Sequence, residues 1–352
     1  MRQIPITSYI NTLSERYQKI LTGKSPLPNG KDLINILQCV EDLKILFADS
    51  NKTIKEQHKD GKQKRKKNLL NRKRYVVYLE KLKERLDNGL LLIRPSEFEN
   101  EINIFSALLT PEEMSKKIRI GTKKNSAYKT FTEIIQEKLC YKTIRNQVFP
   151  YFIRELGIKA CVYCNSQYAL TDEDNRGFYQ LDHWKPASKY PYLCACFFNL
   201  QPCCASCNLN KRDDDREYHS IWNESNNNDN ELYRFKITPA SLAHYILTHQ
   251  TDDLQIQLDA VRRAELLEPL KDKLHINHLY DELKDVAEEV VWKRMAYDKG
   301  YYIALGQIFS PIPFTQSEVN RFILGTYANP NDIHKRPLTK LMQDVAKQLG
   351  VI

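Results

Sequence analysis

Four cysteines in the middle of the chain have the spacing of a structural metal site. Cys161 and Cys164 form one Cys-x-x-Cys pair, and Cys204 and Cys207 form a second pair about forty residues later. Four thiolates satisfy a tetrahedral zinc ion and leave no coordination position open. Cys203 is an alternative to Cys204 because it directly precedes it. We therefore predict a structural Zn²⁺ site that ties these two segments together.

A second set of residues lies between and beside the cysteine pairs. Asp182 and His183 are adjacent and follow the strand-like run Phe178-Tyr-Gln-Leu, Asn199 lies downstream, and Asn208 comes directly after Cys207. A lone histidine in a strand is most often structural. Here the histidine stands beside a carboxylate and close to the metal-binding pairs, which favours a catalytic interpretation.

The stretch from Cys161 to Lys211 resembles HNH (ββα-metal) endonucleases of the four-cysteine kind. Its motif residues are Asp182-His183, Asn199 and Asn208, so it matches the variant in which the third motif position is Asn. The resemblance covers about fifty of the 352 residues. It implies a small zinc-stapled nuclease core and metal-dependent hydrolysis of phosphodiester bonds in DNA.

The resemblance also implies a role for each motif residue. His183 would be the general base, since a neutral imidazole accepts a proton from water at cellular pH. Asp182 and Asn208 would hold one catalytic Mg²⁺ or Mn²⁺ through hard oxygen ligands. Asn199 would bridge the loop between the strands and hold His183 in line. The expected products carry 5′-phosphate and 3′-hydroxyl ends.

Four basic residues near the motif are candidate nucleic-acid contacts. Lys211 and Arg212 lie about one helical turn beyond Asn208, where they can reach a phosphate. The alternative is an ordinary solvated helix end. Lys185 and Lys189 lie next to Trp184 and Tyr190, and this basic-aromatic surface could track a nucleic-acid backbone, unless Trp184 simply packs beneath the site. None of these positions predicts recognition of a particular base.

The wider motif is similar to HNH proteins of bacterial anti-phage defence, including the HNH subunit of Septu-type systems. The similarity lies in Asp-His-Trp-Lys-Pro followed by Asn-Leu-x-Pro-Cys-Cys-x-x-Cys-Asn. It implies an antiviral role with a protein partner such as an ABC/SMC-like ATPase. Because an unregulated nuclease is toxic, we expect activation by a partner, by assembly or by modified DNA.

Charge is concentrated in one segment. The chain has a formal net charge of +9, and residues 52–74 contain eleven Lys or Arg against Glu56 and Asp60. This segment alone therefore carries as much net charge as the whole chain. A basic block of this size favours a polyanionic partner, DNA or RNA, because phosphate contacts release condensed counterions. The alternative is a solvated linker.

Composition excludes several other classes of protein. No apolar run is long enough for a membrane helix, and the first residues lack the apolar core of a secretory signal. Seven of the nine cysteines fall between positions 161 and 207, a distribution typical of a metal site rather than of a disulfide framework. We therefore expect a cytoplasmic protein without membrane contact.

These patterns predict an α+β fold that is mainly α-helical. We expect a helical N-terminal region (1–157) with the basic segment 52–74, an HNH core (158–222), and a mostly helical C-terminal region (223–352) with a short strand pair. Helical spacing of apolar residues predicts a helix over 32–47 and a second ending near Leu86. The two helices would form a hairpin, with the basic connector at its tip.

Further elements follow from the same patterns. We predict helices over 128–141, 144–156, 279–290, 314–326 and 338–349, strands around 233–237 and 254–258, and a surface loop over 223–230. Gly157 is expected to end its helix in the left-handed conformation.

Two alternatives to a DNA nuclease stay open. A zinc-stabilised nucleic-acid-binding or assembly module would account for the four cysteines and the basic block, but not for Asp182, His183, Asn199 and Asn208. An HNH nuclease that cuts RNA would use the same residues on another substrate. Cleavage assays on duplex DNA, single strands and RNA separate these possibilities.

Overall fold

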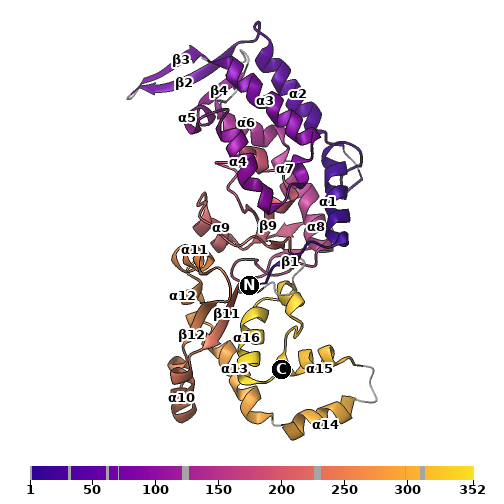
Figure 1. Ribbon diagram of the computed structural model, residues 1–352, viewed down its shortest axis with the longest axis vertical. Coiled ribbons are helices and arrows are strands. Elements are labelled where there is room, and N and C mark those ends of the chain that lie inside the picture. Colours follow the sequence, from indigo (N-terminus) through magenta and orange to yellow (C-terminus); the bar gives the residue numbers. More distant parts are fainter. Residues whose placement is uncertain are drawn as a thin grey trace.

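The protein has an α+β architecture in which helices predominate and the sheets are small. A computed structural model describes residues 2–30, 33–60, 63–69, 71–120, 127–225, 231–297, 299–309 and 314–352. The molecule is elongated, with the N-terminal helices at one end, the C-terminal helices at the other, and β8, β9 and α9 between them (Figure 1). The buried apolar side chains form one continuous cluster from Ile10 to Val351. Within the described ranges, no helix is long and apolar enough to cross a bilayer.

The N-terminal end is built mainly from helices. They are α1 (Ser8–Leu21), α2 (Ile36–Ala48), α3 (Arg72–Asp87), α4 (Phe98–Ser106), α5 (Pro111–Met114), α6 (Phe131–Lys138), α7 (Tyr141–Thr143) and α8 (Phe149–Glu155). Short 3₁₀ turns η1 (Leu90–Leu92) and η2 (Pro95–Glu97) and the π-helical turn η3 (Ile144–Val148) connect some of them.

The predicted hairpin of two helices is present, as α2 and α3. Helix α2 begins at Ile36 because Asn35 caps it, its Oδ1 accepting a hydrogen bond from the Gln38 amide at 3.2 Å. The predicted start at Asp32 lies outside the described residues. Helix α8 ends at Glu155, and Gly157, two residues further on, has a φ of +66°, which confirms the predicted left-handed position after this helix.

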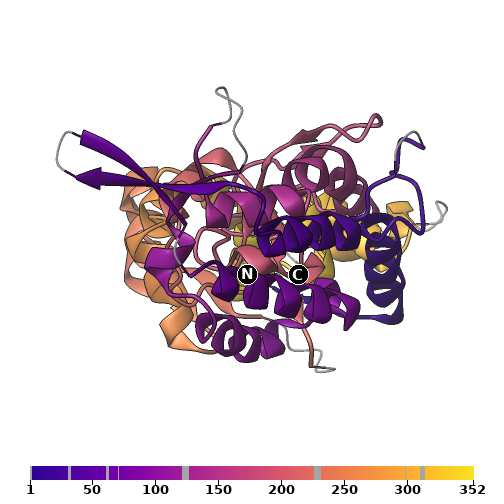
Figure 2. The same ribbon diagram turned by 90° about the horizontal axis from the view of Figure 1, so that it is seen from above.

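The basic segment is not an irregular connector, as the sequence suggested, but a β-hairpin. Strands β2 (Ile54–Asp60) and β3 (Gln63–Asn68) pair antiparallel, and β2 also pairs with β4 (Lys117–Ile120). With β5 (Lys129–Thr130) they form a four-stranded sheet in the order β3-β2-β4-β5. The hairpin extends away from the helices (Figure 2). The strands form because β4, about sixty residues downstream, supplies a pairing partner that local patterning does not reveal.

The middle of the molecule consists of short strands and one short helix. These elements are β6 (Leu170–Thr171), β7 (Gly177–Phe178), β8 (Gln180–His183), η4 (Pro191–Leu193), η5 (Phe197–Asn199), β9 (Leu200–Cys203), α9 (Ala205–Lys211) and β10 (Trp222–Asn223). Strands β8 and β9 pair antiparallel, with Asp182 opposite Gln201 and His183 opposite Leu200. Strand β1 (Ile4–Pro5) pairs parallel with β10, so the first described residues of the chain contact this middle part.

The C-terminal end combines helices with the predicted strand pair. Strands β11 (Tyr233–Ile237) and β12 (Ile256–Ala260) pair antiparallel, with Phe235 opposite Leu258. The helices are α10 (Pro239–Thr248), α11 (Leu267–Asp272), α12 (Ile276–Asp281), α13 (Lys284–Ala296), α14 (Lys299–Phe309), α15 (Gln316–Leu324) and α16 (Thr339–Leu349). The 3₁₀ turns are η6 (Thr251–Asp253), η7 (Ala264–Leu266) and η8 (Pro330–Lys335). Residues 226–230 of the predicted surface loop lie outside the described residues.

Candidate functional site

The four cysteines of the two Cys-x-x-Cys pairs come together in one buried cluster. The sulfur atoms of Cys161, Cys164, Cys204 and Cys207 all lie within 4.8 Å of one another. The Sγ atoms of Cys164 and Cys204 are 3.9 Å apart. A tetrahedral ion with bonds of about 2.3 Å to sulfur requires a sulfur–sulfur spacing of about 3.8 Å. The cluster therefore fits a structural metal ion such as zinc.

The local fold explains how the cysteines are positioned. Cys204 caps α9, because its Sγ accepts a hydrogen bond from the Cys207 amide at 3.4 Å. Both the amide and the hydroxyl of Ser166 donate to Sγ of Cys164, at 3.4 and 3.2 Å. Such donors stabilise thiolates and orient metal ligands.

Side chains from beyond α9 hold the backbone of the first cysteine pair in place. The Tyr280 hydroxyl donates to the Cys164 carbonyl at 2.6 Å, and the Tyr233 hydroxyl to the Tyr163 carbonyl at 3.0 Å. Nε2 of His219 lies 2.9 Å from the Val162 carbonyl. The C-terminal elements thus contact the metal-binding turn directly.

The structure distinguishes Cys204 from Cys203. Cys203 is the last residue of β9 and is fully buried, but it does not belong to the cluster. Successive residues of a strand point to opposite faces, so only one of these neighbours can face the other sulfurs. Cys194 and Cys196 are also buried outside the cluster, as expected for core residues.

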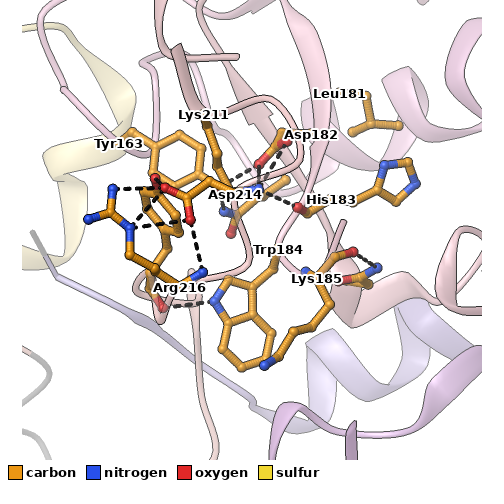
Figure 3. A network of polar contacts seen from close by, with 12 residues as sticks. Tyr163, Leu181, Asp182, His183, Trp184, Lys185, Lys211, Asp214 and Arg216 are labelled. Atoms are coloured by element: carbon orange, nitrogen blue, oxygen red, sulfur yellow. Dashed lines mark hydrogen bonds and ion pairs between the residues drawn. The ribbon is translucent and has the colours of Figure 1, made fainter. Parts of the chain in front are cut away.

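Asp182 lies in a buried polar network (Figure 3). Its Oδ2 accepts a hydrogen bond from the Tyr163 hydroxyl at 2.5 Å and lies 3.0 Å from the Lys211 ammonium. Lys211 also donates to the His183 carbonyl at 2.7 Å. The Gln201 side chain in turn donates to the Tyr163 hydroxyl at 2.5 Å. Tyr163, one of the two residues between Cys161 and Cys164, thus links the metal cluster to Asp182.

The imidazole of His183 points away from the Lys211 ammonium (Figure 3) and is almost fully buried. Its Nε2 lies 3.1 Å from the Cys194 carbonyl. A carbonyl only accepts hydrogen bonds, so Nε2 carries the proton and Nδ1 keeps a free lone pair. The Tyr141 ring packs against the imidazole at a centroid distance of 4.6 Å.

Burial determines the protonation state of His183. Desolvation lowers the pKa of the imidazole to about 4, although the neighbouring Asp182 opposes this shift. The ring is therefore neutral near pH 7. A neutral imidazole with a free lone pair on Nδ1 is a proton acceptor.

Asn199 bridges the loop between β8 and β9. Its Oδ1 accepts a hydrogen bond from the Lys185 amide at 2.7 Å, and its Nδ2 donates to the carbonyls of Lys185 and Leu193, each at 3.1 Å. The side chain is completely buried. This amide therefore fixes both ends of the segment that follows His183.

Asp182, His183 and Asn208 line one surface hollow with a volume of about 420 Å³. Arg145 and Arg212 line it as well, and both are exposed. The hollow thus joins a neutral imidazole, two carboxylates (Asp182 and Asp213), two amides (Gln180 and Asn208) and two guanidinium groups. Such a combination can accept a proton, bind a cation and contact a phosphate.

The basic residues proposed as nucleic-acid contacts have different surroundings. The side chain of Lys211 is 0% exposed and points to Asp182, not to the surface where a phosphate contact was expected. It lies inside because α9 packs this position against β8. Arg212 lines the hollow. Lys185 forms an ion pair with Glu99 at 2.6 Å, and Lys189 forms one with Asp215 at 2.9 Å.

Three residues of the site were missed by sequence reasoning. Tyr141 packs on His183, Tyr163 donates to Asp182, and Arg145 lines the hollow. Tyr141 and Arg145 come from α7 and η3, outside the motif, and only the fold brings them here. Tyr163 lies between Cys161 and Cys164, and this position within the motif was the one indication in the sequence that it belongs to the site.

Comparison with known proteins returned no similar protein. No family model, no curated protein and no solved structure matches the chain.

Proposed function

We propose that this protein is a metal-dependent endonuclease of the HNH kind. The observation that carries the proposal is the hollow in which Asp182, His183 and Asn208 meet. These residues come from β8 and α9, which flank β9, and the four-cysteine cluster lies at the junction of β9 and α9. The order of two strands and a helix on a zinc site is that of the ββα-metal core.

In this proposal His183 is the general base. Its Nδ1 accepts a proton from the attacking water, because Nε2 is already engaged with the Cys194 carbonyl. That carbonyl then stabilises the imidazolium that forms. Asn199 is a positioning residue, since it fixes the backbone that follows His183.

Asp182 and Asn208 are the proposed ligands of one Mg²⁺ or Mn²⁺. Their oxygen donors suit hard cations, and both residues line the hollow. Such an ion, when bound, neutralises charge on the pentacovalent phosphorus and on the departing 3′ oxygen. Arg145 and Arg212 would contact the phosphates on either side.

The four-cysteine cluster would hold a structural Zn²⁺. It fixes the segment before β8 against α9, and so fixes Asp182 relative to Asn208. The unit from Cys161 to Cys207 is small, so metal binding supplies much of its folding free energy.

We infer DNA as the substrate, with RNA as the alternative. The β2–β3 hairpin supports a polyanionic partner because residues 54–68 contain seven of the eleven Lys or Arg of the segment 52–74. A cytoplasmic antiviral role with an ATPase partner is proposed from the motif resemblance alone.

One observation favours a second candidate, a zinc-stabilised binding or assembly module without catalysis. The Asp182 carboxylate is already neutralised by Lys211 at 3.0 Å. In a module without catalysis this pair would be purely structural. In the nuclease, a divalent ion must compete with the ammonium or share the carboxylate with it.

Cleavage assays discriminate between the two. Purified protein should be incubated with supercoiled DNA, single-stranded DNA and RNA in the presence of Mg²⁺ or Mn²⁺. The nuclease proposal predicts ion-dependent cleavage of at least one substrate, with 5′-phosphate ends. Binding without cleavage under every divalent ion would favour the module.

A further inference from the structure

A second hollow lies beside the proposed nuclease site, between the N-terminal helices and the segment that follows His183. Its volume is about 400 Å³, and it is lined by α3, α4, α5 and residues 188–192. Ser188 lines both this hollow and the one that contains His183. The two hollows are therefore neighbours, joined by a few residues of one chain segment.

That joining segment is held rigidly. The amides of Lys189 and Tyr190 both donate to the Pro186 carbonyl, at 3.0 and 2.9 Å. The Gln136 side chain donates to the Ala187 carbonyl at 2.8 Å. A ligand in the second hollow would thus lie at a fixed position relative to the proposed nuclease site.

The walls of the second hollow are aromatic. Phe105 and Tyr192 stack with a centroid distance of 4.0 Å and an interplanar angle of 15°. Tyr78 packs edge-on against Phe105 at 5.2 Å. Flat apolar walls of this kind favour a planar ligand.

The polar groups of the second hollow suit a neutral or anionic ligand. Ser106 and Ser115 supply exposed hydroxyl groups, and none of the described residues that line the hollow carries a carboxylate. Lys189 also lines the hollow, and it forms an exposed ion pair with Asp215. Exposed ion pairs contribute little to stability, so Lys189 can leave Asp215 and bind a phosphate instead.

We propose that this hollow accepts one nucleobase of the bound nucleic-acid strand, turned out of its stack near the scissile phosphate. The inference deepens the proposed function and rests on it for the substrate class. A planar base fits the aromatic walls, its polar edge can pair with the exposed hydroxyls of Ser106 and Ser115, and its phosphate can reach Lys189. The volume is at the low end for ligand pockets, which suits a single base.

The test measures binding to oligonucleotides that lack one base. Abasic positions are moved along single- and double-stranded 20-mers, and affinities are measured with the His183→Ala protein in Mg²⁺ so that no cleavage interferes. At one position, loss of the base should weaken binding about 5- to 150-fold. Ser106→Trp, which fills the hollow from an exposed position at the end of α4, should bind the intact strand as weakly as the abasic one.

Asn103→Trp is the matched control, because Asn103 is exposed on the same helix but does not line the hollow. This variant should bind the abasic strand more weakly than the intact strand, by the same factor as the parent protein. If Ser106→Trp does not fold, Ser115→Trp blocks the same hollow from another exposed position.

The inference is overturned if no abasic position weakens binding, or if the blocked variant still discriminates. Cleavage by the unmodified protein without any sensitive position would reject the base pocket and leave the nuclease proposal intact. If one abasic position weakens binding but the unmodified protein cleaves no substrate, the base pocket is supported and the nuclease proposal is rejected.

Discussion

The ammonium of Lys211 lies 3.0 Å from Oδ2 of Asp182, and neither side chain is more than 6% exposed. The lysine thus places a positive charge next to the carboxylate that is proposed to bind the catalytic ion. Breaking a buried ion pair leaves the remaining charge uncompensated in a medium of low polarity. This pair therefore links the stability of the proposed site to its occupancy by cations.

Lys211→Met should lower the free energy of unfolding by about 3–5 kcal/mol, because Asp182 loses its partner. Added Mg²⁺ or Mn²⁺ should restore more stability to this variant than to the unmodified protein, since the bare carboxylate attracts a divalent cation. Denaturant unfolding with and without the ion measures both effects. Equal responses to the ion would argue against Asp182 as a ligand.

The zinc content of two variants tests which of the neighbouring residues Cys203 and Cys204 is the metal ligand. The protein should bind one zinc ion per chain, and Cys204→Ala should lose it because three thiolates leave the tetrahedron incomplete. Cys203→Ala is the matched control, since Cys203 is buried next to Cys204 but lies outside the cluster. Elemental analysis of the purified variants gives the result. Zinc loss in the Cys203 variant alone would reverse the assignment.

Stability should fall with acidification through buried histidines. Burial lowers the pKa of His334 to about 4, and Nε2 of this ring lies 2.9 Å from the Arg2 carbonyl. Because the folded-state pKa lies below the unfolded value of about 6.5, the unfolded chain binds more protons between pH 6.5 and 4. The free energy of unfolding should therefore fall by about 1.4 kcal/mol per pH unit from this residue as the pH drops through that window.

His334→Gln tests this pH dependence, because Gln can still donate to the Arg2 carbonyl but does not titrate. Denaturant midpoints measured from pH 7 to pH 4 should decline less steeply for the variant than for the unmodified protein. Parallel curves would show that His334 does not contribute to the acid sensitivity.

The basic hairpin should dominate the salt dependence of nucleic-acid binding. Replacing Lys64, Arg65, Lys66 and Lys67 with Gln removes up to four phosphate contacts, each of which contributes about 0.9 to the slope of log affinity against log salt for duplex DNA. We expect the slope to become shallower by up to about 3.6. Lys273→Gln combined with Arg294→Gln, at exposed positions of the C-terminal end, is the control. An unchanged slope in the hairpin variant would assign binding to another surface.

Local spacing in the sequence was sufficient to predict the cysteine cluster, Gly157 at the end of α8 and the pair of β11 and β12. Each depends on residues that are close in the chain or on a motif of fixed geometry. The β2–β3 hairpin within residues 52–74 was missed because its lysines do not alternate with apolar residues. Its strands form by pairing with β4, which no local pattern indicates.

The surroundings of the candidate site were less predictable than its residues. The positions of Asp182, His183, Asn199 and Asn208 followed from the motif, but the direction of Lys211 depends on how α9 docks against β8. Tyr141 and Arg145 reach the hollow from the N-terminal region through tertiary packing. The lowered pKa of His183 arises from burial, and burial becomes visible only in the fold.

The central claim is that His183 accepts the proton from the attacking water. The most direct test compares rates of supercoiled-DNA nicking by the unmodified protein and by His183→Ala in Mg²⁺ or Mn²⁺, at equal zinc content. His244→Ala is the matched control, since His244 is 61% exposed on α10. The account predicts a rate about 10²- to 10⁴-fold lower for His183→Ala and an unchanged rate for His244→Ala. Equal rates for His183→Ala and the unmodified protein would contradict it.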